Sequence, residues 1–112
     1  MNSSELFIKS NGIEPEDVGE GLTRKILGYN PDLMMVKVFF KKGAVGEEHH
    51  HPHRQVTYVE KGSFLVKIDG KEQILNAGDS FFVPADLRHG CVALEDGVLI
   101  DVFTPIRDEF VK

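Results

Sequence analysis

From Asp32 to Pro105 the sequence is a succession of short apolar segments separated by turn-forming residues, and few folds accommodate this pattern. Each segment is rich in Val, Ile, Phe or Tyr and runs for about five to eight residues, as β-strands do. Helical periodicity is weak, and only IEPEDVGEG and the final PIRDEFVK each favour a single turn. The expected strands are DLMMVKVFF, QVTYVE, SFLVKIDG, KEQILNAG, DSFFVPA, GCVALEDG and VLIDVFTP. The sequence therefore predicts an all-β fold with little helix, an antiparallel sandwich or barrel.

The residues between these segments are those that turns require. Gly tolerates a positive φ, and Asn and Asp close Asx turns. They stand at Lys61-Gly62, Asp69-Gly70, Asn76-Ala77-Gly78 and Asp96-Gly97. A chain of 112 residues forms one domain around one core. We expect residues 31–104 to form the barrel and residues 1–30 to form an N-terminal segment with an edge or exchanged strand.

Composition excludes several classes of partner. Eighteen acidic against thirteen basic residues give a net charge of -5, and the basic residues are scattered, unlike those of a nucleic-acid-binding surface. No apolar run reaches the roughly 20 residues that cross a bilayer, and MNSSELFIKS does not resemble a signal peptide. Cys91 is the only cysteine, and its apolar context, HGCVAL, favours a buried packing role over a nucleophile. We expect a cytoplasmic protein that binds neither nucleic acid nor membrane.

The segment HHHPHRQ holds four of the five histidines between residues 49 and 55. In a strand, residues two apart project to the same face. His50 would then point to one side, and the other side would carry His49, His51, His53 and Gln55. Parity alone leaves one candidate metal ligand too many, and a solvated surface would also explain such a run.

The spacing of glycines around these histidines adds a second regularity. G-x5-H-x-H-x3-Q-x6-G runs from Gly43 to Gly62, and G-x5-P-x-D-x2-H runs from Gly78 to His89. These blocks resemble the two motifs of the cupin family, G-x5-H-x-H-x3,4-E-x6-G and G-x5-P-x-G-x2-H-x3-N. The resemblance implies a cupin barrel of jelly-roll topology with a metal inside, near one mouth. The metal ligands that it implies are His49, His51, Gln55 and His89.

Three positions depart from the family motifs. Gln55 stands where glutamate is usual, Asp86 replaces the second glycine, and Ala93 replaces the final asparagine. Gln55 alters the chemistry, because three imidazoles and an amide are neutral and leave the full charge on a bound cation. We expect one divalent transition-metal ion, without distinguishing Zn, Ni, Fe, Mn and Cu. With the ligands so assigned, His53 becomes a residue at the rim of the site.

Two longer segments, HPHRQVTYVEKG and LEDGVLIDVFTPIRDEF, are similar to those of the small cupins of the KdgF type. That resemblance covers nearly the whole chain. It implies a metal-dependent enzyme that binds a small anionic sugar, a 4,5-unsaturated monouronate from pectin or alginate, and converts it to the linear 5-keto-4-deoxyuronate. Barrels of this size commonly pair edge strands or exchange a terminal strand, so we also expect a homodimer.

The segment VLIDVFTP offers a proton-transfer residue for this reaction. Strand alternation places Leu99, Asp101 and Phe103 on one face, so Asp101 lies between two apolar residues. Inside a barrel, burial would raise the pKa of Asp101 toward the range useful in general acid-base catalysis. The alternative is an exposed aspartate on an edge strand, or a structural partner of a nearby arginine.

Phe103 and Arg107 complete the predicted catalytic set with Asp101 and Gln55. Phe103 would form a flat wall for a sugar ring. Arg107 follows four residues later and would bind a carboxylate in two-point fashion at the barrel mouth, or else pair with Asp108 or Glu109 at the surface.

Two other functions remain open for a chain with this pattern. A cupin dioxygenase would use the metal to activate oxygen, although Gln55 and the pair Asp101 and Arg107 favour carboxylate chemistry. A sugar-binding cupin module would hold its ligand without turnover. The cupin barrel accommodates many chemistries, so the fold does not choose between them.

Overall fold

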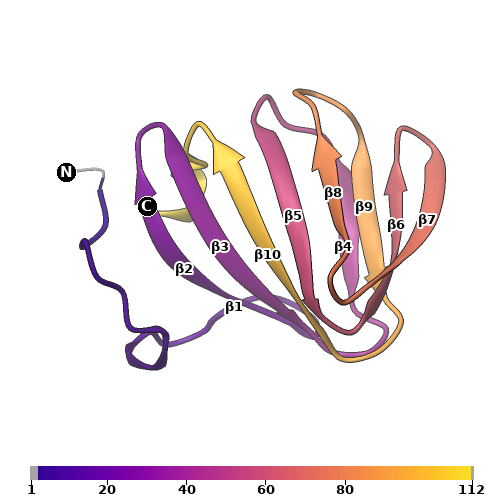
Figure 1. The fold of residues 1–112 in the computed structure, drawn as a ribbon, viewed down its shortest axis with the longest axis horizontal. Helices are drawn as coiled ribbons and strands as arrows, with labels where there is room; N and C mark the ends of the chain where they lie inside the picture. The colour runs from indigo at the N-terminus through magenta and orange to yellow at the C-terminus, as the bar shows by residue number, and fades with distance from the viewer. Residues whose placement is uncertain (1–2, 112) are drawn as a thin grey trace.

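The computed structural model describes residues 3–111, which form ten strands and two single-turn 3-10 helices (Figure 1). The strands are β1 (Glu16–Gly19), β2 (Leu22–Asn30), β3 (Leu33–Phe40), β4 (Val45–His49), β5 (Arg54–Lys61), β6 (Ser63–Ile68), β7 (Lys71–Asn76), β8 (Ser80–Val83), β9 (His89–Ala93) and β10 (Gly97–Thr104). The helical turns are η1 (Ser10–Gly12) and η2 (Asp108–Phe110). Within residues 3–111, no helix has the length and apolar character needed to span a membrane.

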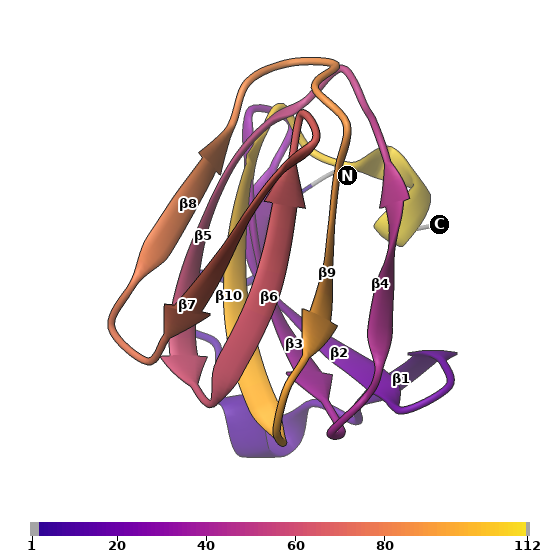
Figure 2. The same ribbon diagram turned by 90° about the vertical axis from the view of Figure 1, so that its right-hand side faces the viewer.

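The strands form two antiparallel sheets that face each other. One has six strands in the order β1-β2-β3-β10-β5-β8, and the other has four in the order β4-β9-β6-β7. Figure 2 shows the four-stranded sheet in front of the six-stranded one. Because the chain passes repeatedly from one sheet to the other, five of the eight pairs of neighbouring strands are not consecutive in sequence. The fold is therefore a jelly roll flattened into two sheets, each with its own edges.

All seven strands that the sequence predicts are present, as β3 and β5 to β10. The final turn is also present, as η2. Three further strands, β1, β2 and β4, were not assigned to particular residues, although an edge or exchanged strand was expected within residues 1–30. The expected turn in IEPEDVGEG is wrong, because Glu16–Gly19 of this segment forms β1 and pairs with β2.

The core lies between the two sheets in two clusters. The larger contains Phe40, Phe64 and Leu99, with the rings of Phe40 and Phe64 in T-shaped contact at 5.0 Å. The second surrounds Phe103 and includes Ile106 from the C-terminal segment. The larger cluster contains inward-facing residues from both sheets and so fixes their separation, whereas the second packs the C-terminal segment against the six-stranded sheet.

Two residues of the cupin motifs have a left-handed backbone that explains their identity. Gly62 has φ 85°, and a Cβ there would lie 2.6 Å from the carbonyl oxygen of Asp96, so only glycine fits between β5 and β6. Asp86 has φ 65°, which aspartate tolerates better than most residues. Its backbone N–H donates to the carbonyl oxygen of His51 at 2.7 Å. The turn at Asp86 therefore supports residues 50–53 between β4 and β5, which we call the histidine loop.

Candidate metal centre

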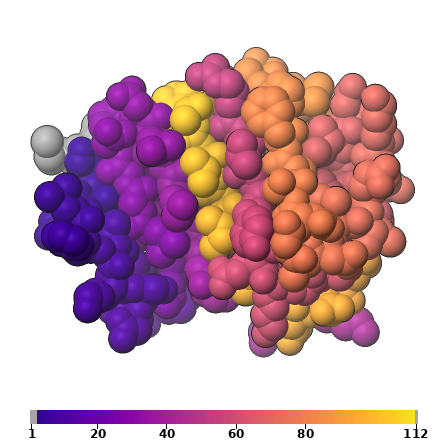
Figure 3. All heavy atoms as spheres, in the orientation of Figure 1, coloured from indigo at the N-terminus to yellow at the C-terminus, as the bar shows by residue number. Residues whose placement is uncertain are grey.

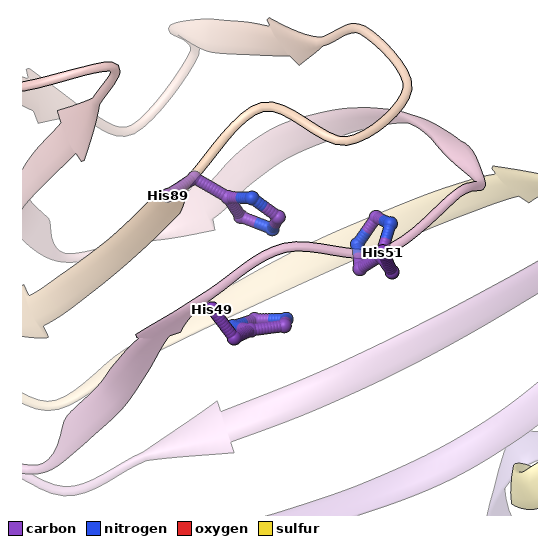
Figure 4. A group of neighbouring side chains, drawn as sticks. All are labelled: His49, His51 and His89. Carbon is purple, nitrogen blue, oxygen red and sulfur yellow. The ribbon is translucent and has the colours of Figure 1, made fainter.

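Three histidines from three segments converge at one end of the space between the sheets. His49 ends β4 and pairs in register with His89, which begins β9. His51 reaches them from the loop that follows β4. The nitrogen ligand atoms of the three side chains all lie within 4.8 Å of one another. Figure 4 shows the three rings turned toward a common space, which we call the imidazole cluster.

Strand parity assumes that His49 to Gln55 form one strand, and these residues do not form one. β4 ends at His49, and β5 begins at Arg54 in the other sheet. The connecting residues 50–53 carry His51 inward and leave His50 exposed. Strand parity therefore does not bring these ligands together; pairing of β4 with β9 and passage of the chain between the sheets do so.

Each imidazole of the cluster is oriented by the backbone. In all three rings, Nδ1 lies at hydrogen-bond distance from a carbonyl oxygen two residues away along the chain. A carbonyl only accepts, so Nδ1 carries the proton and Nε2 presents a lone pair, as metal-binding histidines require. The acceptors are Glu47 O for His49 at 2.7 Å, His53 O for His51 at 3.1 Å, and Leu87 O for His89 at 3.0 Å.

Gln55 provides a fourth donor atom beside the cluster. Its Nε2 donates to Thr57 Oγ1 at 2.8 Å and to Asp101 Oδ1 at 3.3 Å, which turns Oε1 toward His51 Nε2 at 3.1 Å. Two lone pairs then face each other, and either a proton or a cation must lie between them. Ligands about 2.1 Å from one ion at right angles lie about 3 Å apart, so this contact fits a shared metal.

Burial keeps two imidazoles of the cluster, those of His51 and His89, in the form that binds metal, whereas His49 is exposed. Loss of hydration lowers the pKa of His89 to about 4. Burial also lowers the pKa of His51, with a further lowering by the positive charge of Arg107. Only 5% of each of these two residues is exposed. Both rings are therefore neutral near pH 7, and binding an ion does not require either to lose a proton.

Asp101 projects from β10 into the same space. Burial raises its pKa to about 6, although the Thr57 hydroxyl and the charge of Arg107 oppose the rise. Thr57 donates to Asp101 Oδ1 at 2.6 Å. Thr57 is fully buried, and the sequence did not identify it as a site residue. The feature that could have indicated its role is its position two residues after Gln55, on the same face of β5.

A cavity of about 140 Å³ joins these groups, on the order of one that accommodates a single six-membered ring. Its wall includes Asp101, Phe103 and Arg107 together with His49, His89 and Gln55. Arg107 lines the cavity and also forms the ion pair with Glu109 that the sequence allowed. Its guanidinium lies 5.2 Å from the Phe103 ring centroid and lines the cavity, while its Nε and Nη2 pair with Glu109 at 3.1 and 3.0 Å.

His53 and Cys91 lie beside the site without joining the imidazole cluster. His53 Nε2 hydrogen-bonds to the carbonyl oxygen of Ile106 at 3.0 Å, which ties the histidine loop to the segment that carries Arg107. Burial raises the pKa of the Cys91 thiol to about 12, so it does not form a thiolate nucleophile at neutral pH. Cys91 packs against the core, consistent with the expected structural role.

Comparisons with known proteins agree with this geometry. Residues 36–103 match the family model described as "Cupin domain". The pectin degradation protein KdgF of Dickeya dadantii (strain 3937) is 48% identical over 98 residues, covering 86% of this chain and 89% of that protein. An RmlC-like cupin from Shewanella frigidimarina superimposes with a TM-score of 0.96 at 50% identity, covering 98% and 99% of the two chains. KdgF from Halomonas sp. gives a TM-score of 0.92 at 42% identity over 96% and 99%. The chain belongs to the cupin family.

Proposed function

We propose that the protein opens the ring of 4,5-unsaturated monouronates and converts them to the linear 5-keto-4-deoxyuronate. One observation carries the proposal: Gln55 and Thr57 both donate to Asp101, and Gln55 also borders the imidazole cluster. A proton-transfer group thus lies next to a cation site in one cavity. The 48% identical relative is named for the degradation of pectin, a polymer whose breakdown releases such monouronates.

We further propose that one divalent transition-metal ion belongs to this site. Zn, Ni, Fe, Mn and Cu all suit a nitrogen-rich donor set. The ligands would be Nε2 of His49, His51 and His89 together with Oε1 of Gln55. When bound, the ion supplies Lewis-acid stabilisation of negative charge on substrate oxygens. Its charge would remain uncancelled, because all four donors are neutral.

The reaction moves two protons and needs no electron acceptor. The hemiacetal hydroxyl at C1 loses its proton, the bond between C1 and the ring oxygen breaks, and C1 becomes an aldehyde. The ring oxygen keeps the electron pair of that bond and becomes the enolate oxygen at C5. Protonation of C4 then gives the ketone. One proton leaves an oxygen and one is added to a carbon, so the product is an isomer of the substrate.

Asp101 is suited to move these protons. With a pKa of about 6, it exchanges a proton near neutral pH at a small free-energy difference, which favours general acid-base catalysis. Thr57 holds Oδ1, and no hydrogen bond within residues 3–111 occupies Oδ2. Oδ2 is therefore the atom that we assign to the substrate.

Phe103 and Arg107 would place the sugar acid against Asp101. Phe103 is 2% exposed, and its ring is in edge contact with His51 at 5.9 Å, which provides a rigid wall beside the imidazole cluster. The Arg107 guanidinium stacks over this ring and would donate to the substrate carboxylate if Glu109, which is half exposed, gives way.

The decay of the alkene absorbance of an unsaturated uronate tests the proposal directly. We expect metal-loaded wild-type protein to remove the absorbance without consuming oxygen. Asp101→Asn should slow the decay at least a hundredfold, and Thr57→Val should slow it about tenfold, with metal content unchanged. Unchanged decay in Asp101→Asn and Gln55→Ala with metal bound would contradict the mechanism. Oxygen uptake would indicate a dioxygenase, and binding without decay a sugar-binding module.

A further inference from the structure

Arg24 lines the same cavity, although no motif points to it. It lies on β2, where alternation places Leu22, Arg24 and Ile26 on the face that turns toward the core. Its guanidinium carbon lies 3.8 Å from the centroid of the Phe110 ring, and only 15% of its side chain is exposed. A cation this deeply buried requires compensating partners.

The partners of Arg24 leave most of its donors unused. Its Nε donates to Glu16 Oε1 at 2.9 Å, and no other hydrogen bond joins the guanidinium to residues 3–111. Its terminal nitrogens are not among the buried atoms that lack a partner, so they reach open space. Arg107, by contrast, has both Nε and Nη2 engaged by Glu109. Of the two arginines in the cavity wall, Arg24 has more donors available for a ligand.

Arg24 and the imidazole cluster line one cavity from different sheets. Arg24 projects from β2 of the six-stranded sheet, whereas His49 and His89 project from β4 and β9 of the four-stranded sheet. The rings of Phe103 and Phe110, 5.9 Å apart, line the same cavity, and Phe110 contacts Arg24. A ligand bound at the imidazole cluster therefore shares the cavity with Arg24 and this aromatic wall.

We infer that Arg24 is a second substrate anchor, which donates hydrogen bonds to hydroxyl or carbonyl oxygens of the bound sugar. The inference rests on the proposed function for its substrate class, a six-carbon uronate. With its carboxylate at the imidazole cluster, such a molecule carries further oxygens that face the cavity wall. Glu16, whose side chain is 53% exposed, competes with the substrate for the guanidinium.

Calorimetric titration of metal-loaded protein with galacturonate tests the anchor without turnover, since this saturated uronate has no alkene to react. We expect Arg24→Gln to weaken binding about tenfold or more, because charge-assisted hydrogen bonds are lost. Glu16→Gln should tighten binding several-fold by releasing the guanidinium. Lys25→Gln makes the same charge change on the opposite face of β2 and should have no effect.

Phe110→Leu distinguishes anchoring from a purely structural role. If Arg24 only holds Phe110 in place, Phe110→Leu will weaken galacturonate binding as much as Arg24→Gln does. Glu16→Gln will then leave the affinity for galacturonate unchanged. These two results together overturn the inference. If Arg24→Gln does not fold, Glu16→Gln decides: tighter binding supports the anchor and unchanged binding overturns it. Failure of the wild type to consume an unsaturated uronate would instead overturn the proposed function.

Discussion

Gln55 joins the metal site to the proton-transfer site, because one end of its amide faces His51 and the other donates to Asp101. Replacement by glutamate would keep an oxygen ligand and cancel part of the charge of the cation. It would also replace a donor to Asp101 with a second carboxylate, which disfavours ionisation of both. Gln55 is thus the residue at which the usual cupin ligand would alter both halves of the site.

We expect Gln55→Glu to retain its metal and to bind the anionic substrate at least several-fold more weakly. The Michaelis constant from the alkene assay, with metal content measured on the same sample, checks this expectation. An unchanged Michaelis constant in metal-replete Gln55→Glu would show that the neutral ligand set does not attract the substrate. Loss of metal from the variant would show that an amide oxygen is needed for metal binding itself.

The raised pKa of Asp101 affects stability as well as catalysis. In the metal-free protein the folded state binds this proton more tightly than the unfolded state, with a pKa of about 6 against 3.8. The contribution of Asp101 to stability is therefore fully present below pH 3.8 and is lost as the pH rises through about 6. Asparagine cannot ionise, so it avoids this loss.

Asp101→Asn should consequently be more stable than the wild type at pH 7 by about 1–3 kcal/mol, with the difference shrinking toward zero near pH 4. Urea denaturation of chelated samples across this range measures the difference. A constant difference between the two proteins at all pH values would show that Asp101 has an ordinary pKa in the folded state. Activity should change in the opposite direction, because the same group transfers the proton.

The sequence predicts some site residues much better than others, for physical reasons. His49, His51 and His89 stand in fixed motifs, and Asp101 interrupts an apolar alternation, so each carries a local signal. Arg24 carries none, because a single arginine in a strand is ordinary unless its inward face is known. That face depends on the register of β2 with β3, which the order of residues does not reveal.

Gly62 shows how one turn controls two elements. It is the only residue between β5 and β6, and a Cβ there would lie 2.6 Å from Asp96 O and 2.8 Å from the Cα of Gly97, at the start of β10. Gly70 has a similar φ of 79°, but nothing lies within 4 Å of its Cβ position. The two glycines therefore share backbone strain and differ in available space.

We expect Gly70→Ala to lower the free energy of unfolding by about 1 kcal/mol, the strain of a left-handed alanine. Gly62→Ala should lower it by about 3 kcal/mol or more, since overlap with rigid backbone is added. Chemical denaturation of both variants provides the comparison. Equal losses would show that the chain moves aside at Gly62 and that the close approach of β10 is not needed.

β5 was predictable because one of its faces is buried and the other is exposed. Its residues alternate between exposed and buried from Arg54 to Glu60. β4 is almost entirely exposed, and its GEEH segment has no apolar alternation. β2 is half buried along nearly its whole length, because the core covers one face and Ser4 and Ile8 of the N-terminal segment pack near the other. Neither pattern is visible from local hydrophobicity.

At the scale of the whole molecule, local patterns predict antiparallel strands without giving their order. The resemblance to the cupin motifs implied a jelly roll in which His49 and His89 meet, and the structure brings them together by pairing β4 with β9. The local patterns left a sandwich and a barrel open, and the resemblance favoured the barrel. The structure has two separate sheets, because strands such as β8 end a sheet without a further partner.

On the outer face of the six-stranded sheet, an uncharged row crosses the four strands β3, β10, β5 and β8. Figure 3 shows these strands side by side as purple, yellow, magenta and orange bands. Met35 pairs with Val102, Val102 with Val56, and Val56 with Phe82. Met35, Val56 and Phe82 are 40%, 49% and 56% exposed. A flat apolar row matches a second copy of itself about a twofold axis, so we expect a homodimer through this face.

Val56→Glu should convert this dimer to a monomer, because it would bury a carboxylate opposite apolar side chains in the interface. Ile74→Glu is the matched control, since Ile74 is 58% exposed on the other sheet and should leave the dimer intact. Light scattering coupled to size exclusion measures the mass of each protein. A wild-type monomer at micromolar concentration, or a Val56→Glu dimer, would show that this row does not form the interface. Because the cavity lies between the two sheets and away from this row, the monomeric variant should retain its activity in the alkene assay.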